Sequence, residues 1–158
     1  MTGVGIAFGI GLAITGALAF ASPRRRLSIL AWSALAVGWG VTVIVAPYGD
    51  KYVWVFPGMD LVVGVWAMIM ASRLKCYWAA ILGLLFLGQC LLHIAYNLFN
   101  VAGPTDPLRV YRYYRSINLL LIAQMVCVSW PGLWNGCVVL FNRLRGFSRH
   151  SRRKEMAP

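Results

Sequence analysis

Charged side chains are scarce in this chain. They make up 12% of the residues, against roughly 25% in soluble globular domains, whereas 60% of the residues are hydrophobic. This composition excludes an ordinary soluble domain and indicates one membrane domain. The formal net charge of +11 would suggest a nucleic-acid partner in a soluble protein. Here the basic residues cluster at the ends of apolar stretches, so topology and anionic lipid explain them better, and no nucleic-acid partner is expected.

Cysteine and histidine are too few and too scattered for a metal or redox centre. The four cysteines contain no Cys-x-x-Cys pair: Cys76, Cys90, Cys127 and Cys137. The two histidines are His93, in an apolar stretch, and His150, near the C-terminus, so one chain cannot offer a haem two ligands within the membrane. A phosphate-cradling glycine loop and a nucleophile with a matched base are also missing. We therefore expect no cofactor, no metal and no enzymatic activity.

Apolar stretches of roughly membrane-spanning length fill most of the 158 residues. A run of about 20 apolar residues matches an acyl core about 30 Å thick. We therefore predict an all-α, polytopic transmembrane helix bundle over residues 1–141, with spans at about 2–21, 27–47, 52–72, 77–99 and 117–141. The third span reaches membrane-spanning length only if it includes Pro57 and Asp60, which are unfavourable in a membrane helix. A four-span bundle without this segment is therefore the alternative. Residues 142–158 are predicted to form a basic cytoplasmic tail that lies on the surface or is disordered.

The basic residues predict the topology. With five spans, 11 of them fall on one side of the membrane: Arg24, Arg25, Arg26, Arg73, Lys75, Arg143, Arg145, Arg149, Arg152, Arg153 and Lys154. The other side receives 4: Lys51, Arg109, Arg112 and Arg115. The positive-inside rule then predicts a plasma (inner) membrane protein with its N-terminus outside and its C-terminus in the cytoplasm. The arginines at 24–26 and the basic residues of the tail are expected to face anionic lipid.

Polar residues inside the spans are the candidate functional residues, because each costs free energy in lipid unless it is paired or faces water. Gln89, His93 and Asn97 follow one another at intervals of four and share one helix face. His93 lies roughly 24 Å from the cytoplasmic edge of its span, and Asp60 lies roughly 20 Å from Arg73. Similar depth on consecutive antiparallel helices predicts that Asp60 and His93 can pair.

Such a pair could be a structural ion pair, or it could carry protons along a polar pathway. In the alternative interpretation, Asp60 caps a helix that begins after Pro57-Gly58, and His93 only hydrogen-bonds across the bundle. Two amides of the fifth span could extend the network or form separate interhelical bonds: Asn118 and Gln124.

Small residues predict close helix packing, because lipid provides no hydrophobic drive between helices. Gly5 with Gly9, and Gly132 with Gly136, form small-xxx-small pairs. They either mediate contacts within one chain or, for the glycine-rich first helix, form an oligomer interface. The segment 108–115 would, as a helix, gather its arginines on one side. It is either an interfacial helix whose arginines reach lipid phosphates or an aromatic belt that leads into the fifth span.

In layout the chain resembles the small multi-span membrane proteins of bacteriophages and prophages, including the holins. The shared traits are short length, tight turns, few charges in the membrane and the basic tail from Arg143 to Lys154. The resemblance implies an inner-membrane protein that oligomerises and opens lesions to release a lytic enzyme, with the first helix as its assembly surface. Two other functions stay open. The chain could be an accessory subunit that binds another membrane protein, or a small proton-linked transporter or channel that uses Asp60, Gln89 and His93.

Overall fold

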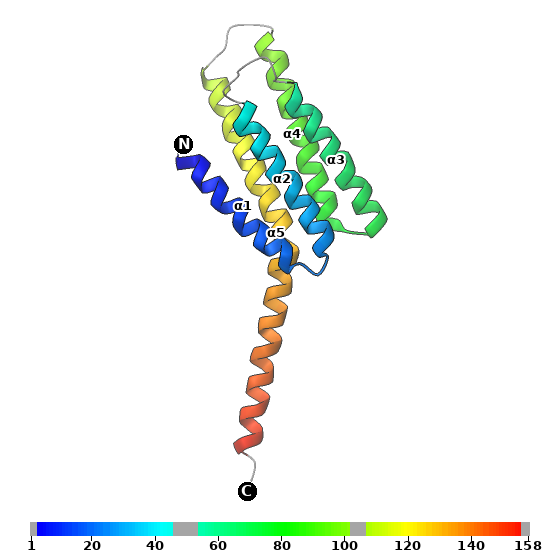
Figure 1. Cartoon of the computed structure of the whole chain (residues 1–158), viewed down its shortest axis with the longest axis vertical. Coiled ribbons are helices and arrows are strands. Elements are labelled where there is room, and N and C mark those ends of the chain that lie inside the picture. Colours follow the sequence, from blue (N-terminus) through cyan, green and yellow to red (C-terminus); the bar gives the residue numbers. More distant parts are fainter. Residues whose placement is uncertain (1–2, 46–53, 102–106, 156–158) are drawn as a thin grey trace.

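The computed structural model describes residues 3–45, 54–101 and 107–155, and all of its regular structure there is α-helical. The helices are α1 (Gly3–Ala21), α2 (Arg25–Val45), α3 (Val55–Leu74), α4 (Tyr77–Val101) and α5 (Pro107–Glu155). They run up and down as a bundle, from which the C-terminal part of α5 projects alone (Figure 1). The predicted all-α fold is confirmed.

Four described helices are long and apolar enough to cross a membrane: Arg25–Ile44, Val55–Leu74, Tyr77–Phe99 and Val110–Asn142. The apolar part of α1, Gly5–Ala21, is shorter. Large hydrophobic side chains cover the outside of all five helices, which suits a surface solvated by lipid. The protein is therefore a multi-pass membrane protein. The four-span alternative omitted the wrong segment, because α3 meets the length and apolarity of a span.

The core lies among α1, α2, α4 and α5. Its buried residues are Leu12, Ala19, Ala31, Leu35, Leu82, Phe86, Cys127 and Val128. α5 contacts α1, α2 and α4 and thus forms the centre of the bundle, whereas α3 packs mainly on α4. The indole of Trp32 donates a hydrogen bond to the carbonyl of Leu12 at 2.8 Å, and Gly16 leaves room for this ring because a β-carbon there would lie 2.9 Å from it.

Glycine permits close backbone approach at two helix contacts. A β-carbon on Gly132 of α5 would overlap the carbonyl oxygen of Leu18 in α1. Between α3 and α4, a β-carbon on Gly83 would lie 3.0 Å from the carbonyl oxygen of Gly64. The second contact was not predicted. Of the predicted packing glycines only Gly132 has this role, because a β-carbon on any of the others meets nothing within 4 Å: Gly5, Gly9 and Gly136.

Helix α5 begins at Pro107, where the missing proline amide costs nothing in the first turn, and not at about 117 as predicted. Of the two interpretations of the segment 108–115, the separate interfacial helix is wrong, because the segment is continuous with the fifth span. Helix α5 also continues to Glu155, so the tail expected to be disordered or laid on the surface is helical. Its 49 residues amount to about 73 Å, more than twice the thickness of an acyl core.

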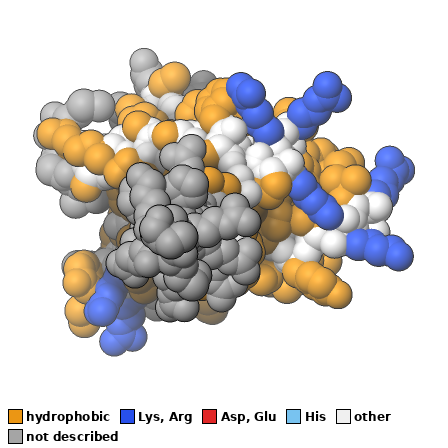
Figure 2. Space-filling view, turned by 90° about the horizontal axis from the view of Figure 1, so that it is seen from below, with side chains coloured by type: hydrophobic (Ala, Val, Ile, Leu, Met, Phe, Trp, Pro, Cys, Tyr) orange, Lys and Arg blue, Asp and Glu red, His pale blue; other side chains and the backbone are white. Residues whose placement is uncertain are grey.

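The basic turns of the bundle lie at one end. Lys75 adopts a left-handed conformation, with φ 47° and ψ 55°, and closes the short α3–α4 turn. The guanidinium of Arg24 donates a hydrogen bond to the carbonyl of Leu74 at 2.9 Å, so the α1–α2 turn lies beside it. Arg25 sits over the ring of Phe20, at 5.1 Å from its centroid, and Arg26 is exposed. The described Lys and Arg side chains point away from the bundle (Figure 2).

Some predicted lipid contacts fall on side chains outside the described part of the structure. These are the side chains of Lys51, Arg109, Arg143, Arg145, Arg149, Arg152, Arg153 and Lys154.

Candidate functional site

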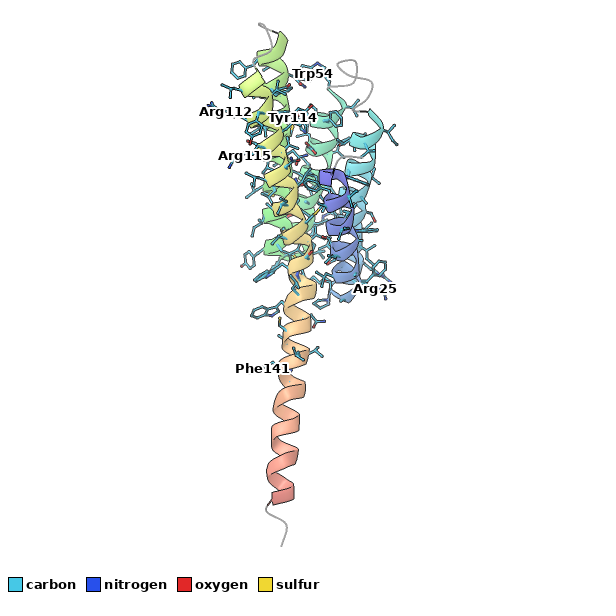
Figure 3. The ribbon with its side chains drawn as sticks, turned by 90° about the vertical axis from the view of Figure 1, so that its left-hand side faces the viewer. Arg25, Trp54, Arg112, Tyr114, Arg115 and Phe141 are labelled. Atoms are coloured by element: carbon cyan, nitrogen blue, oxygen red, sulfur yellow. The ribbon has the colours of Figure 1, made fainter. Side chains whose placement is uncertain are left out.

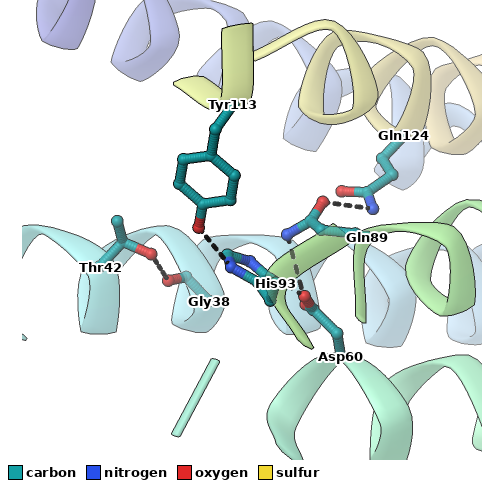
Figure 4. A network of polar contacts seen from close by, with 7 residues as sticks. All are labelled: Gly38, Thr42, Asp60, Gln89, His93, Tyr113 and Gln124. Carbon is teal, nitrogen blue, oxygen red and sulfur yellow. Dashed lines mark hydrogen bonds and ion pairs between the residues drawn. The ribbon is translucent and has the colours of Figure 1, made fainter. Parts of the chain in front are cut away.

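Three helices bring five polar side chains together inside the bundle (Figure 4). Asp60 comes from α3, Gln89 and His93 come from α4, and Tyr113 and Gln124 come from α5. The interval of four between Gln89 and His93 places both on the face of α4 that looks toward α3 and α5. Asp60 is 7% exposed, His93 6% and Gln124 0%, so the network is shielded from lipid.

Asp60 is held by two neighbours on α4. Its Oδ2 lies 3.3 Å from His93 Nε2, within ion-pair distance but without the alignment of a hydrogen bond. Its Oδ1 accepts a hydrogen bond from Gln89 Nε2, also at 3.3 Å. Each carboxylate oxygen thus faces an N–H group of α4, which offsets part of the cost of placing a carboxylate in the bundle.

The network continues from α4 to α5 at both ends. Gln124 Nε2 donates to Gln89 Oε1 at 3.0 Å, and the Tyr113 hydroxyl lies 2.5 Å from His93 Nδ1. When Nε2 of His93 carries its proton toward Asp60, Nδ1 is free to accept the proton of the Tyr113 hydroxyl. In that tautomer polar contacts join Tyr113 to Gln124, and the step from His93 to Asp60 is an ion-pair contact without a hydrogen bond.

Aromatic rings surround the upper part of the network. Phe56 of α3 stacks on the imidazole of His93, with centroids 5.6 Å apart and planes inclined by 21°. Tyr96 of α4 stacks on Tyr113 at 3.8 Å. These rings exclude solvent around the imidazole, and a low local dielectric strengthens the electrostatic coupling between His93 and Asp60.

The structure brings Asp60 and His93 together, as the residue count predicted. The interpretation of Asp60 as an N-cap is wrong: α3 begins at Val55 after Trp54, so Asp60 lies within the helix. Asn97, one turn above His93, is buried as well, at 4% exposure. Gln124 joins the network, whereas Asn118 lines a groove on the outer face of α5.

Tyr113 is the network residue that sequence reasoning missed. It was assigned to the loop before the fifth span, although it precedes Gln124 by 11 residues. Eleven residues are close to three full helical turns, so both side chains project from the same face of one helix. This spacing was the available signal, and it becomes visible once α5 is allowed to begin at Pro107.

The chemistry of the site is that of proton binding. A carboxylate, an imidazole and a phenol hydroxyl in sequence can each accept and release a proton. Within the described residues there is no group of three or more His, Cys, Asp or Glu side chains that could hold a metal ion. Fold and site together define a class: small multi-pass membrane proteins with a buried ionisable network. The chain matches no protein-family model, no curated protein and no solved structure.

Proposed function

We propose that this protein is a small proton-linked transporter or channel in which Asp60 and His93 bind the proton. One observation carries the proposal: side chains of three helices form one polar network inside the bundle, and three of its members are ionisable. Ionisable residues in membrane spans are costly, and where they occur they commonly mark ion or proton pathways. Here the ionisable side chains are gathered at one site and are not scattered over the helices.

The network provides a route of proton transfer from α5 to α3. A proton that arrives at the Tyr113 oxygen allows the hydroxyl to release its own proton to His93 Nδ1. The imidazolium that forms can pass the proton on Nε2 to Asp60 Oδ2, 3.3 Å away. His93 returns to neutrality with its proton on Nδ1, and Asp60 is neutralised. The transfer moves one proton toward α3 and removes the charge that Gln89 stabilises.

Proton flux into vesicles tests this proposal. The purified protein is reconstituted into liposomes that contain a pH-sensitive dye, and a pH gradient is imposed with the membrane potential clamped. We expect proton flux with the unmodified protein. Asp60→Asn should reduce it to the rate of protein-free vesicles, because the amide keeps the contact with Gln89 but cannot take up a proton. His93→Gln should have the same effect.

A matched control comes from Thr42 of α2. Its hydroxyl donates a hydrogen bond to the carbonyl of Gly38 in the same helix, at 2.9 Å, and the residue takes no part in the network. Thr42→Val should therefore leave the flux unchanged. Flux that persists in Asp60→Asn would refute the proposal, provided that the variant elutes as a folded protein in detergent.

We propose that the N-terminus lies outside and the C-terminus in the cytoplasm of the plasma (inner) membrane. The hydrogen bond between Arg24 and Leu74 supports this orientation, because it holds two basic turns at the same end. The helical tail projects from that end as well (Figure 1). The positive charges thus gather on one side, as the positive-inside rule requires of a cytoplasmic face. Reporter fusions to the C-terminus test the orientation, and an exported reporter would overturn it.

A holin-like oligomer that permeabilises the membrane is the second candidate function, and one face of α1 favours it. A β-carbon on Gly5 or Gly9 would meet nothing within 4 Å, and the neighbouring side chains of Ile6 and Ile10 are more than half exposed. Such a face could approach a second copy closely. Induced expression with a membrane-potential dye tests it: sudden depolarisation would support the holin-like function, and steady growth would count against it. A stoichiometric partner on purification would instead favour an accessory subunit.

A further inference from the structure

A groove of about 260 Å³ runs along the outer face of α5. Every residue that lines it belongs to this helix: Tyr111, Tyr114, Arg115, Asn118, Leu119 and Ile122. The spacing of three and four residues places them on one stripe. Tyr114 and Arg115 project outward from the upper part of α5, above the middle of the bundle (Figure 3).

The lining changes from polar to apolar along the helix. Tyr111, Tyr114 and Arg115 form the upper end, whereas Leu119 and Ile122 form the lower end. Ile122 follows Arg115 by seven residues, which is about 10 Å of helix. A phospholipid changes from polar to apolar over a similar distance, with its phosphate above and its acyl chain below.

Arg115 is an exposed cation eight residues after the start of α5, inside the apolar stretch Val110–Asn142. A cation at membrane depth needs an anionic partner or a contact with the headgroups. The described part of the chain gives Arg115 no ion pair, since its one such contact joins His93 to Asp60.

The orientation of the side chain completes the match. Long side chains on a helix lean toward its N-terminus. For α5 this is the upper end of the bundle (Figure 1). Arginine in such a place extends its charged group to the phosphates and leaves its stem along the apolar surface. Tyrosine rings are well suited to the same depth.

We propose that this groove binds one phospholipid. The guanidinium of Arg115 holds its phosphate, the rings of Tyr111 and Tyr114 flank the headgroup, and an acyl chain lies along Leu119 and Ile122. Planar guanidinium groups bind phosphate oxygens through two parallel hydrogen bonds. The groove shares no residue with the proton network, although the ring of Tyr114 packs edge-on against that of Tyr113, with centroids 5.3 Å apart.

Arg115→Gln and Arg112→Gln form a matched pair for the test. Both arginines are exposed on α5, three residues apart, but Arg112 does not line the groove. Each variant is purified in detergent with added phosphatidylglycerol, and the phospholipid bound per chain is measured by native mass spectrometry as a function of lipid concentration. Arg115→Gln should weaken binding of the tightest phospholipid by about tenfold, the effect of losing a charge-assisted hydrogen bond. Arg112→Gln should bind as the unmodified protein does.

Two results would overturn the proposal. Equal affinity in Arg115→Gln and the unmodified protein would show that the groove holds no phosphate. An equal loss in both variants would show that positive charge on α5 attracts lipid without a defined site. A third variant, Arg115→Lys, keeps the charge but cannot bind bidentately, so an affinity between those of arginine and glutamine is expected. Because both positions are exposed, each of the three variants should keep the elution profile and helical circular dichroism of the unmodified protein.

Discussion

The contact of Gly132 with Leu18 allows a sharp test of how α1 packs on α5. Gly132→Ala places a methyl group on the carbonyl oxygen of Leu18, a backbone atom that cannot rotate away. Gly136→Ala makes the same change one turn further along α5, where nothing lies within 4 Å. The gain in helix propensity, about 1 kcal/mol at most, is common to both variants. Their stabilities should therefore differ by the cost of overpacking alone.

Overpacking typically costs about 1–3 kcal/mol. For Gly132→Ala we expect a cost near the upper value, because the backbone carbonyl of Leu18 cannot move aside. A difference of about 3 kcal/mol corresponds to a factor of roughly 100 in the unfolding equilibrium. The assay is reversible unfolding of detergent-solubilised protein with increasing sodium dodecyl sulfate, followed by circular dichroism and tryptophan fluorescence. Two variants of equal stability would refute the packing of α1 on α5 described above, and so would a Gly136→Ala variant that is the less stable of the two.

Two further substitutions probe contacts inside the bundle. Trp32→Phe removes the hydrogen bond to the Leu12 carbonyl and should lower the free energy of unfolding by about 0.5–1.5 kcal/mol, measured in the same titration; no loss would mean that the indole N–H has another partner. Gln124→Leu should change the free energy of unfolding little. It removes one interhelical hydrogen bond, worth about 0.6 kcal/mol on average. It also removes the buried Oε1 atom, which lacks a hydrogen-bond partner and whose loss offsets part of that cost. It should nevertheless slow proton flux in the vesicle assay, because Gln89 loses the donor that orients it toward Asp60; an unchanged flux would place Gln124 outside the working network.

Much of this architecture was predictable because lipid leaves few alternatives for a long apolar run. Backbone amides and carbonyls have no partners in hydrocarbon except each other, so such runs become helices. The contact between Asp60 and His93 was predictable for a related reason. A fixed rise per residue and a short turn, here at Lys75, set the register of two antiparallel helices, and depth can then be counted from the sequence.

The remaining features depend on how each helix is rotated about its own axis relative to its neighbours. The sequence of one helix alone does not determine that rotation. Gly64 and Gly83 meet because α3 and α4 turn particular faces toward each other, whereas Gly5 and Gly9, four residues apart on α1, have nothing within 4 Å of an added β-carbon. Tyr113 was missed for a different reason. The fifth span was predicted to begin at about 117, but a proline in the first turn begins a helix as readily as it ends one, and α5 begins at Pro107.

Helix α5 carries both the buried site and the C-terminal basic end, and Gly132 lies at its contact with Leu18 of α1. Tyr113 lies 19 residues above Gly132 and Glu155 lies 23 residues below it, or about 28 Å and 35 Å of helix. Pro131 stands inside the helix at this point, and a proline in a helix interior removes one backbone hydrogen bond and favours a kink. The helix can therefore bend beside its contact with α1, so that the direction of the basic end is set separately from the position of Tyr113.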